Sequence, residues 1–406
     1  MPVSRRRVFY IPGFDPFPPR RYRELYRREG AVQADLLGYV LRQFKGQGPF
    51  EWIVEAEIEG AQVTTSIEVL VWSDLVSDSM RATIPATYAQ LARTVWTYVS
   101  SGAFRRLARL RRGPVVAALY PVVVLMLQAA VALAAGLGVA ALVIGIIPAG
   151  VGRAAGWILG PIVTALLVWG ILGWFKAHDG RIFAHYLMHD YAFTARDGGA
   201  YPPELEARLS RFADRIADAL EEGWDEVLVV GHSSGAHLGV SVLADLVRSG
   251  RADRDRLSFL SLGQVIPMVS FLPEARRLRA DLALLSGTDG VPWVDVSAPA
   301  DGCAFALCDP VAVSGVGSGE QQWPLVLSAA FTRTLSVEAQ DALKWRFFRR
   351  HFQYLCAFDA LDGRPEDYDY FRVTAGPMRL ADRFAGRAPS PSRVTAPLSP
   401  YTDRAA

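Results

Sequence analysis

The segment Gly231-His232-Ser233-Ser234-Gly235 has the residue types and spacing of a serine nucleophile on a tight turn. Residues 227–230 before it are aliphatic, as in a buried strand, and residues 236–244 after it have an apolar helical pattern. A G-x-S-x-G sequence between a strand and a helix lifts its serine above the edge of a sheet. The flanking glycines carry no side chains that would collide with neighbouring backbone. We therefore predict that Ser233 is a nucleophile.

This strand–turn–helix motif resembles the nucleophile elbow of the α/β-hydrolase superfamily, whose members include esterases, lipases and thioesterases. The resemblance also rests on the order of elements around the elbow and on the turn Pro12-Gly13-Phe14 after an early apolar strand. It covers most of the chain outside a long apolar insertion. It implies a mainly parallel sheet flanked by helices and a serine hydrolase that needs no cofactor and no metal.

The resemblance implies two further catalytic side chains, in the chain order serine, acid, histidine. His351 is the expected base. Of the 6 histidines, three precede the elbow, and His232 and His237 sit on it with their side chains expected to point away from the serine proton. The acid is expected just after the strand predicted at residues 292–297. Asp301 stands there in a turn, and Asp309, before Pro310, is the alternative. Such a carboxylate holds the imidazole in the required tautomer and stabilises the imidazolium.

The oxyanion hole of this family is built from two backbone N–H groups. One would come from Ser234, the residue after the nucleophile, and the other from Phe14, in the loop after the early strand. Gly13 permits the backbone turn, and we expect Gly13 and His232 to lie against the substrate. Donors aimed at the developing negative charge contribute about 3 kcal/mol each to catalysis.

Strands that alternate with helices predict an α/β fold with a mainly parallel sheet, whose ligands bind at the carboxyl ends of the strands. Strands are expected at residues 8–11, 52–58, 67–72, 227–230, 257–262, 292–297 and 325–329. Helices are expected after Pro19, at residues 83–110, after Pro203, at residues 236–247 and at residues 337–357.

A long apolar insertion separates the early strands from the elbow. Residues 113–152 contain no charged side chain, and residues 154–175, after Arg153, contain none either. About 20 apolar residues suffice to cross a bilayer core of about 30 Å. One sheet cannot assemble across a membrane, so the number of crossings must be even. We expect a two-helix transmembrane hairpin at residues 113–175 with its turn at residues 147–153, although the first stretch could also be two short spans broken near residues 136–138.

Basic residues flank the insertion on both sides. Five arginines precede the first span, and Lys176 and Arg181 follow the second, whereas the turn holds only Arg153. This bias predicts that both flanks, and with them the catalytic domain, face the cytoplasm. The five arginines are Arg105, Arg106, Arg109, Arg111 and Arg112.

Four segments follow from these features. Residues 1–112 and 176–386 would form the two parts of one hydrolase domain, residues 113–175 the membrane hairpin, and residues 387–406 a disordered tail rich in Pro, Ser and Ala. The net charge of +2 gives no reason to expect a nucleic-acid partner. The 3 cysteines have no zinc-finger spacing and indicate reduced thiols. The oligomeric state is not fixed by the sequence.

Together these features predict a membrane-anchored serine hydrolase that cleaves a lipid-like or acyl ester or thioester. The alternative is a non-catalytic membrane scaffold or binding protein that retains the hydrolase fold, because His351 stands in a helical context beyond the last strand. His185 and His189, four residues apart, could also share a helix face as metal ligands. They lack the glutamate of the H-E-x-x-H motif and are expected to be polar residues of an interfacial helix instead.

Overall fold

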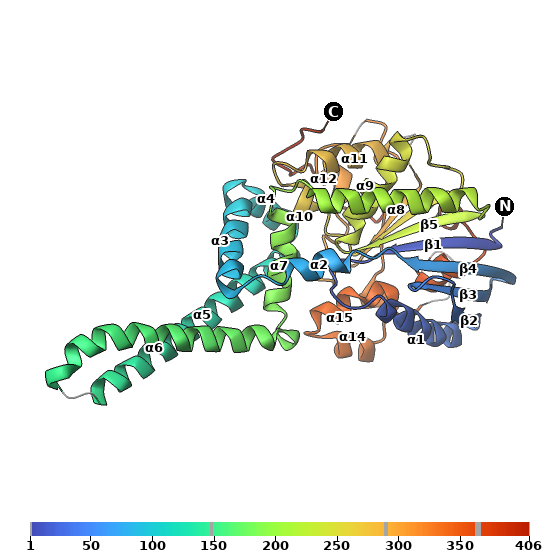
Figure 1. Ribbon diagram of the computed structural model, residues 1–406. Coiled ribbons are helices and arrows are strands. Elements are labelled where there is room, and N and C mark those ends of the chain that lie inside the picture. The colour runs from blue at the N-terminus through green and yellow to red at the C-terminus, as the bar shows by residue number, and fades with distance from the viewer. Residues whose placement is uncertain (1, 147–148, 288–290, 318, 362–366, 406) are drawn as a thin grey trace. The chain divides into compact units, whose positions relative to one another are not determined.

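A single eight-stranded sheet organises the part of the chain that the structure describes (Figure 1). The computed structural model describes residues 2–146, 149–287, 291–317, 319–361 and 367–405, without the side chains of residues 146 and 149–155. The strands are β1 (Arg5–Ile11), β2 (Val40–Lys45), β3 (Glu51–Ile58), β4 (Ala61–Val69), β5 (Glu226–His232), β6 (Leu257–Leu262), β7 (Trp293–Ser297) and β8 (Leu325–Ser328).

The order of the strands across the sheet is β2-β3-β4-β1-β5-β6-β7-β8. The six strands β4, β1, β5, β6, β7 and β8 are parallel to one another. Strand β3 is antiparallel to both β2 and β4. The α/β class and the mainly parallel sheet agree with the expectation from the sequence. The edge strand β2 was not expected, because its side chains are partly exposed on both faces and give no clear alternation.

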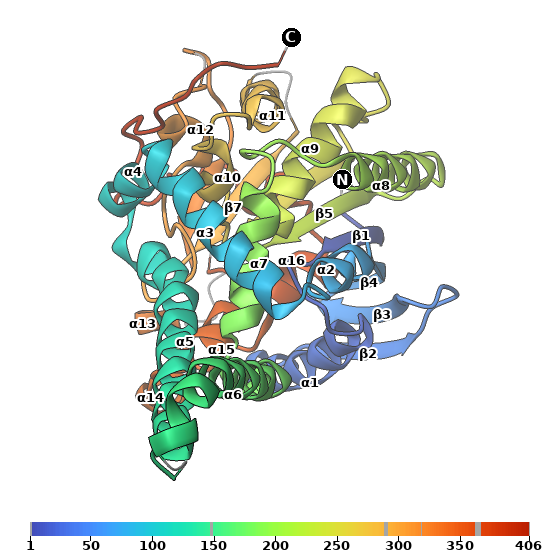
Figure 2. The ribbon, with the colours of Figure 1, turned by 60° about the vertical axis from the view of Figure 1, so that its left-hand side comes forward.

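Helices cover both faces of the sheet (Figures 1 and 2). One face carries α8 (Pro203–Glu221), α9 (Gly235–Arg248) and α11 (Arg276–Ser286). The other carries α1 (Arg20–Leu37), α16 (Tyr370–Ala375) and α17 (Leu380–Arg383), whose buried side chains belong to one core cluster. All residues of β5 are buried, as expected for a parallel strand with helices on both of its faces. Successive side chains of β1 point to opposite faces of the sheet. Tyr10 of this strand packs on Tyr22 of α1, with ring centroids 4.8 Å apart.

The direction of the chain reverses between the two central strands. From β1 the chain passes through α1 toward β2, at one edge of the sheet, whereas from β5 it passes through α9 toward β6, β7 and β8. Loops that leave two adjacent parallel strands in opposite directions open a crevice at the strands' carboxyl ends, where α/β proteins bind their ligands. The turn after β1 and the turn after β5 are both at this point.

Two predicted helices are interrupted. The helix expected at residues 83–110 is divided into α3 (Ile84–Ser100) and α4 (Ala103–Leu110) at Gly102, which has a φ of 73°. The helix expected at residues 337–357 is divided into α14 (Val337–Leu343), α15 (Phe347–His351) and the 3₁₀ turn η2 (Gln353–Leu355). Trp345, with a φ of 63°, stands at the first of these breaks. The sequence pattern predicted each of the two segments as one helix and did not reveal the breaks at Gly102 and Trp345.

The C-terminal segment differs from the disordered tail that its composition suggested. Val394 forms a bridge with Cys308, and the Ser390 N–H donates to the Val326 carbonyl over 2.8 Å. The guanidinium of Arg279, which is fully buried, donates to the Asp403 carboxylate over 2.8 Å. A buried cation needs such a partner. The tail therefore supplies hydrogen-bond acceptors to the folded domain.

The chain divides into two compact units, which we describe separately. The first comprises residues 1–77, 98–115 and 197–406, and it contains the whole sheet. Its remaining helices are α2 (Ser73–Ser79), α10 (Pro267–Ser270), α12 (Pro310–Val313) and α13 (Phe331–Thr334). The second comprises residues 78–97 and 116–196, with most of α3 and α5 (Arg112–Ile146), and with α6 (Ala149–Ala177), η1 (Asp179–Arg181) and α7 (Ala184–Ala195).

Two helices of the second unit are long and apolar enough to cross a membrane. Their spans are Arg112–Gly145, with a mean hydropathy of 2.4, and Gly156–Ala177, with 2.0. Only 22% and 11% of their most apolar windows are buried, unlike the core helix of a soluble domain. The first span runs through residues 136–138 without a break. Of the turn predicted at residues 147–153, residues 147 and 148 lie outside the described residues, and α6 already begins at Ala149.

Candidate active site

Ser233 stands at the sharp turn between β5 and α9. Its φ is 57°, in the left-handed region that few non-glycine residues adopt. The Ser233 N–H donates to the Leu262 carbonyl over 2.9 Å, which ties the turn to the end of β6. The side chain is partly exposed, whereas His232 and Ser234 on either side are buried. The turn thus presents one hydroxyl at the carboxyl end of the sheet.

The two glycines of the elbow are required by close backbone contacts. A Cβ atom on Gly235 would lie 2.1 Å from the carbonyl oxygen of Ile11, and one on Gly231 would lie 2.6 Å from the Gly235 oxygen. Both distances are far below van der Waals contact. The elbow therefore packs directly on the end of β1, and this contact needs glycine at both positions.

The turn after β1 lies against Ser233. A Cβ atom on Gly13 would be 2.9 Å from the Ser233 Cβ and 3.4 Å from its Oγ. The indole N–H of Trp72 donates to the Pro12 carbonyl over 2.9 Å and fixes the turn from behind. Phe14 is buried with its ring edge-on to that indole, 6.0 Å away between centroids. The Pro12-Gly13-Phe14 turn and Ser233 thus come together as expected.

His351 and Asp301 form a buried pair. The Nδ1 atom of His351 is 2.7 Å from Oδ2 of Asp301. The same oxygen accepts from the Tyr354 hydroxyl over 3.0 Å, and Oδ1 accepts from the Cys303 N–H over 2.9 Å. Burial raises the pKa of Asp301, but the charge and hydrogen bond of His351, together with the other two donors, leave that pKa below its ordinary value. Asp301 is therefore a carboxylate aimed at one imidazole nitrogen.

His232 joins this pair to the elbow. Its Nε2 is 2.9 Å from the backbone carbonyl oxygen of His351, and the two imidazole centroids are 4.8 Å apart. Burial lowers the pKa of His232 to about 3, and the neighbouring His351 adds to this effect. A neutral ring with its proton on Nε2 donates to that carbonyl. His232 was expected to face the substrate, but its side chain is buried and holds the backbone of the residue proposed as base.

Asp309 does not join the pair. Its Oδ1 accepts from the N–H groups of Val311 and Ala312 over 3.1 and 3.0 Å, and its Oδ2 accepts from the Gln321 amide over 2.9 Å. Asp309 is thus the N-cap of α12, with both oxygens already satisfied. An Asp directly before Pro310 is a frequent start of a helix, and the sequence alone did not separate that role from the catalytic one.

Two residues of the site were not anticipated. Tyr354 donates to Asp301 and also accepts the Ala298 N–H over 3.0 Å, so its hydroxyl links Asp301 to the end of β7. Gly263, with a φ of 51°, lies beside His351, because a Cβ there would be 3.2 Å from Cε1 of that residue. The one available signal for Tyr354 was its position three residues after the predicted base.

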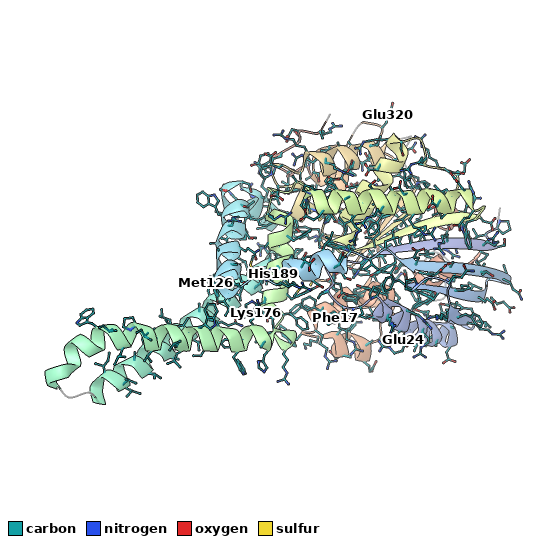
Figure 3. All side chains as sticks on the ribbon, viewed as in Figure 1. Phe17, Glu24, Met126, Lys176, His189 and Glu320 are labelled. Atoms are coloured by element: carbon teal, nitrogen blue, oxygen red, sulfur yellow. The ribbon has the colours of Figure 1, made fainter. Side chains whose placement is uncertain are left out.

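The residues of the site fit a metal ion poorly. In the described part of the chain, Asp301, Cys303 and His351 are the one group of potential ligands whose atoms lie within 4.8 Å of one another. Both Asp301 oxygens already accept hydrogen bonds, and burial raises the pKa of the Cys303 thiol. A metal ion needs the deprotonated thiolate. His185 and His189 are buried on α7. Burial lowers the pKa of His189, labelled in Figure 3, to about 4.

Comparisons with protein-family models, with curated proteins and with solved structures find no match for this chain. What the site does must therefore be inferred from its own geometry.

Proposed function

We propose that this protein is a membrane-anchored serine hydrolase that cleaves an ester or thioester through an acyl-serine intermediate. The observation that carries the proposal is the buried His351–Asp301 pair beside a strained serine turn, joined to it through His232. A structural turn needs neither a left-handed serine nor an imidazole held by a buried carboxylate. Strain and buried charge of this kind are typical of catalytic sites.

In the proposed reaction, Ser233 Oγ attacks the carbonyl carbon while Nε2 of His351 takes the hydroxyl proton. Asp301 keeps the Nδ1–H of His351 in place and stabilises the imidazolium. The proton then passes to the departing alcohol or thiol, and an acyl-serine ester remains. A water molecule then gives a proton to the same imidazole and attacks the carbonyl carbon of that ester. As the bond to Ser233 Oγ breaks, the imidazolium returns the proton to Oγ, which releases the acid and the free serine. The backbone N–H groups of Phe14 and Ser234 would bind the oxyanion in both steps.

The position of the site at the sheet supports this assignment. The turn with Gly13 and the turn with Ser233 follow the two strands between which the chain reverses direction. The order serine, acid, histidine along the chain is that of the α/β-hydrolase superfamily, and on these grounds we propose the chain as a member of it. The acid follows β7 and the base follows β8.

The apolar helices support the membrane part of the proposal. We propose that α5 and α6 cross the bilayer as a hairpin, because their apolar side chains are mostly exposed to the surroundings. The arginines before α5, with Lys176 and Arg181 after α6, would hold both flanks on the cytoplasmic side. An active site tethered to a bilayer favours substrates that are poorly soluble in water, such as lipid-like or acyl esters.

The proposal is tested with a fluorophosphonate probe, which labels activated serines covalently. We expect the wild type to be labelled and Ser233→Ala to lose the label. Ser249→Ala is the matched control, because Ser249 is an exposed serine just after the end of α9, and it should be labelled like the wild type. An unlabelled wild-type protein, or equal labelling of the Ser233→Ala variant, would overturn the proposal.

A further inference from the structure

The turn between α14 and α15 presents two large aromatic side chains to solvent. Trp345 is 79% exposed and Phe347 is 51% exposed. Lys344 directly before Trp345 and Arg346 between the two rings are exposed cations. Two adjacent large aromatic side chains with this exposure mark a candidate interaction site, whereas single exposed apolar residues do not.

The turn is held in this shape. Trp345 has a φ of 63°, which is rare for a bulky residue and persists only when the surroundings impose it. The Arg346 N–H donates to the Leu343 carbonyl over 3.1 Å and closes the turn. Arg350 donates to the Leu343 carbonyl over 3.1 Å and to the Ala300 carbonyl over 3.2 Å. The exposed rings are therefore carried on an ordered support.

This turn adjoins both the proposed acid and the beginning of α5. A Cβ atom on Gly302, the residue after Asp301, would be 3.7 Å from Phe347. On Gly113, in the first turn of α5, a Cβ would be 3.1 Å from the Cα of the same Gly302. All of these residues belong to the first unit. The exposed rings are thus part of a surface continuous with the start of a helix that is apolar enough to cross a membrane.

We propose that residues 344–347 form a membrane-contact turn that places Trp345 and Phe347 among the headgroups of an anionic bilayer. Indole rings favour the membrane–water interface, and each cation close to an anionic surface contributes about 1 kcal/mol of attraction, or roughly fivefold in the docking equilibrium. The charges of the turn itself are both positive, with Arg349 following, and the acidic Glu338 and Asp341 belong to α14. Two aromatic side chains cover too little area for a stable protein dimer.

This inference goes beyond the hairpin, because it assigns a second lipid contact to the unit that holds the sheet. If the hydrolase proposal also holds, the contact would set the site beside the surface from which a lipid-like substrate leaves the bilayer. The test below does not depend on catalysis, so the two proposals can fail independently.

The test uses the full chain reconstituted into vesicles that contain a brominated lipid, which quenches nearby tryptophans. The emission of Trp345 is the difference between the wild type and Trp345→Phe. Trp224 is the matched control, read from Trp224→Phe, because it lies just before β5, at the opposite end of the sheet, with the Arg5 guanidinium 4.6 Å from its ring. We expect the Trp345 emission to be quenched in anionic vesicles and the Trp224 emission to be unaffected. Lys344→Gln together with Arg346→Gln should weaken docking by about fivefold for each cation removed.

Three results would overturn the proposal. Equal quenching of Trp345 and Trp224 would show no preferred contact of the turn with lipid. Quenching that is unchanged when zwitterionic lipid replaces the anionic lipid would remove the role of the cations. Acrylamide quenches exposed tryptophans. If Trp345 in lipid-free detergent became better protected from acrylamide as the protein concentration rose, the turn would instead contact a second copy of the chain. Far-UV circular dichroism of each variant confirms that the fold is intact before these readings are compared.

Discussion

Nδ1 of His351 lies 2.7 Å from Oδ2 of Asp301, and the two residues are 50 positions apart in the chain. Because a carboxylate can only accept, the proton of the neutral imidazole stands on Nδ1 and is donated to Asp301. The other nitrogen, Nε2, is then free of a proton and can accept one from a hydroxyl. Because Asp301 also accepts from Tyr354 and from the Cys303 N–H, the carboxylate cannot rotate away from the imidazole without breaking these bonds. The pair is therefore set before any substrate arrives.

Asp301→Asn should abolish most of the activity while leaving the fold intact. The amide preserves the shape of the side chain but can turn its NH₂ toward Nδ1, which places the imidazole in the wrong tautomer. In serine hydrolases with such a pair, this substitution reduces kcat by about 10⁴-fold. The measurement is kcat on a soluble short-chain ester, supported by the rate of fluorophosphonate labelling.

Asp309→Asn is the matched control for that variant. Asn is as good an N-cap as Asp, so the start of α12 should remain and kcat should stay within a few-fold of wild type. If the Asp309 variant lost activity and the Asp301 variant kept it, the roles proposed for the two aspartates would be reversed.

His232→Ala should lower kcat more than it raises KM. Its ring is buried and contacts the backbone carbonyl of His351, so its removal loosens the base without removing a group that touches the substrate. The lost hydrogen bond and the cavity would also reduce the free energy of unfolding by about 1–3 kcal/mol. Steady-state kinetics with a soluble ester separates the two constants. A large increase in KM with unchanged kcat would instead assign His232 to substrate binding.

Much of the central sheet could be predicted from the sequence, because buried parallel strands are short aliphatic runs bounded by turns. The run before Ser233 is of this kind. The strand before Asp301 is as fully buried, but it alternates valine with Trp293, Asp295 and Ser297. The contact of Tyr354 with Asp301 joins positions 53 apart, and no local pattern encodes such a contact. The break at Trp345 depends on a left-handed residue within an apolar helical pattern, and the ordering of the tail depends on partners such as Arg279 that are distant in sequence.

Asp295→Asn should remove one contribution to stability that is lost as the pH rises. Burial raises the pKa of Asp295 to about 7. The hydrogen bond from Ser261 lowers this pKa, and the charge of the nearby Asp309 raises it. The folded state thus favours the protonated form. Its stabilisation is complete below the ordinary pKa of 3.8 and is lost as the pH rises through about 7. At 1.36 kcal/mol per pKa unit, the loss amounts to at most roughly 4 kcal/mol.

The unfolding midpoint of the purified protein, measured from pH 4 to pH 8, checks this prediction. The stability of the wild type relative to Asp295→Asn should fall over that range, and Asp295→Asn should be the more stable of the two at pH 8. Asp255→Asn is the control, because Asp255 is exposed and its replacement should leave the pH profile unchanged. A difference in stability between the wild type and Asp295→Asn that stays constant from pH 4 to pH 8 would contradict the assignment.

Gly136→Ile should destabilise the apolar helix pair, whereas Gly138→Ile should not. A Cβ on Gly136 of α5 would be 3.0 Å from the carbonyl oxygen of Thr164 in α6, but one on Gly138 meets nothing within 4 Å. Small residues at such contacts let two helices approach closely in a membrane. Overpacking at Gly136 should cost about 1–3 kcal/mol.

The measurement is the SDS concentration at which the purified chain unfolds, followed by circular dichroism. Because the two variants add the same side chain two residues apart on one helix, they differ in packing and not in hydrophobicity. Equal midpoints would mean that α5 and α6 do not pack through Gly136.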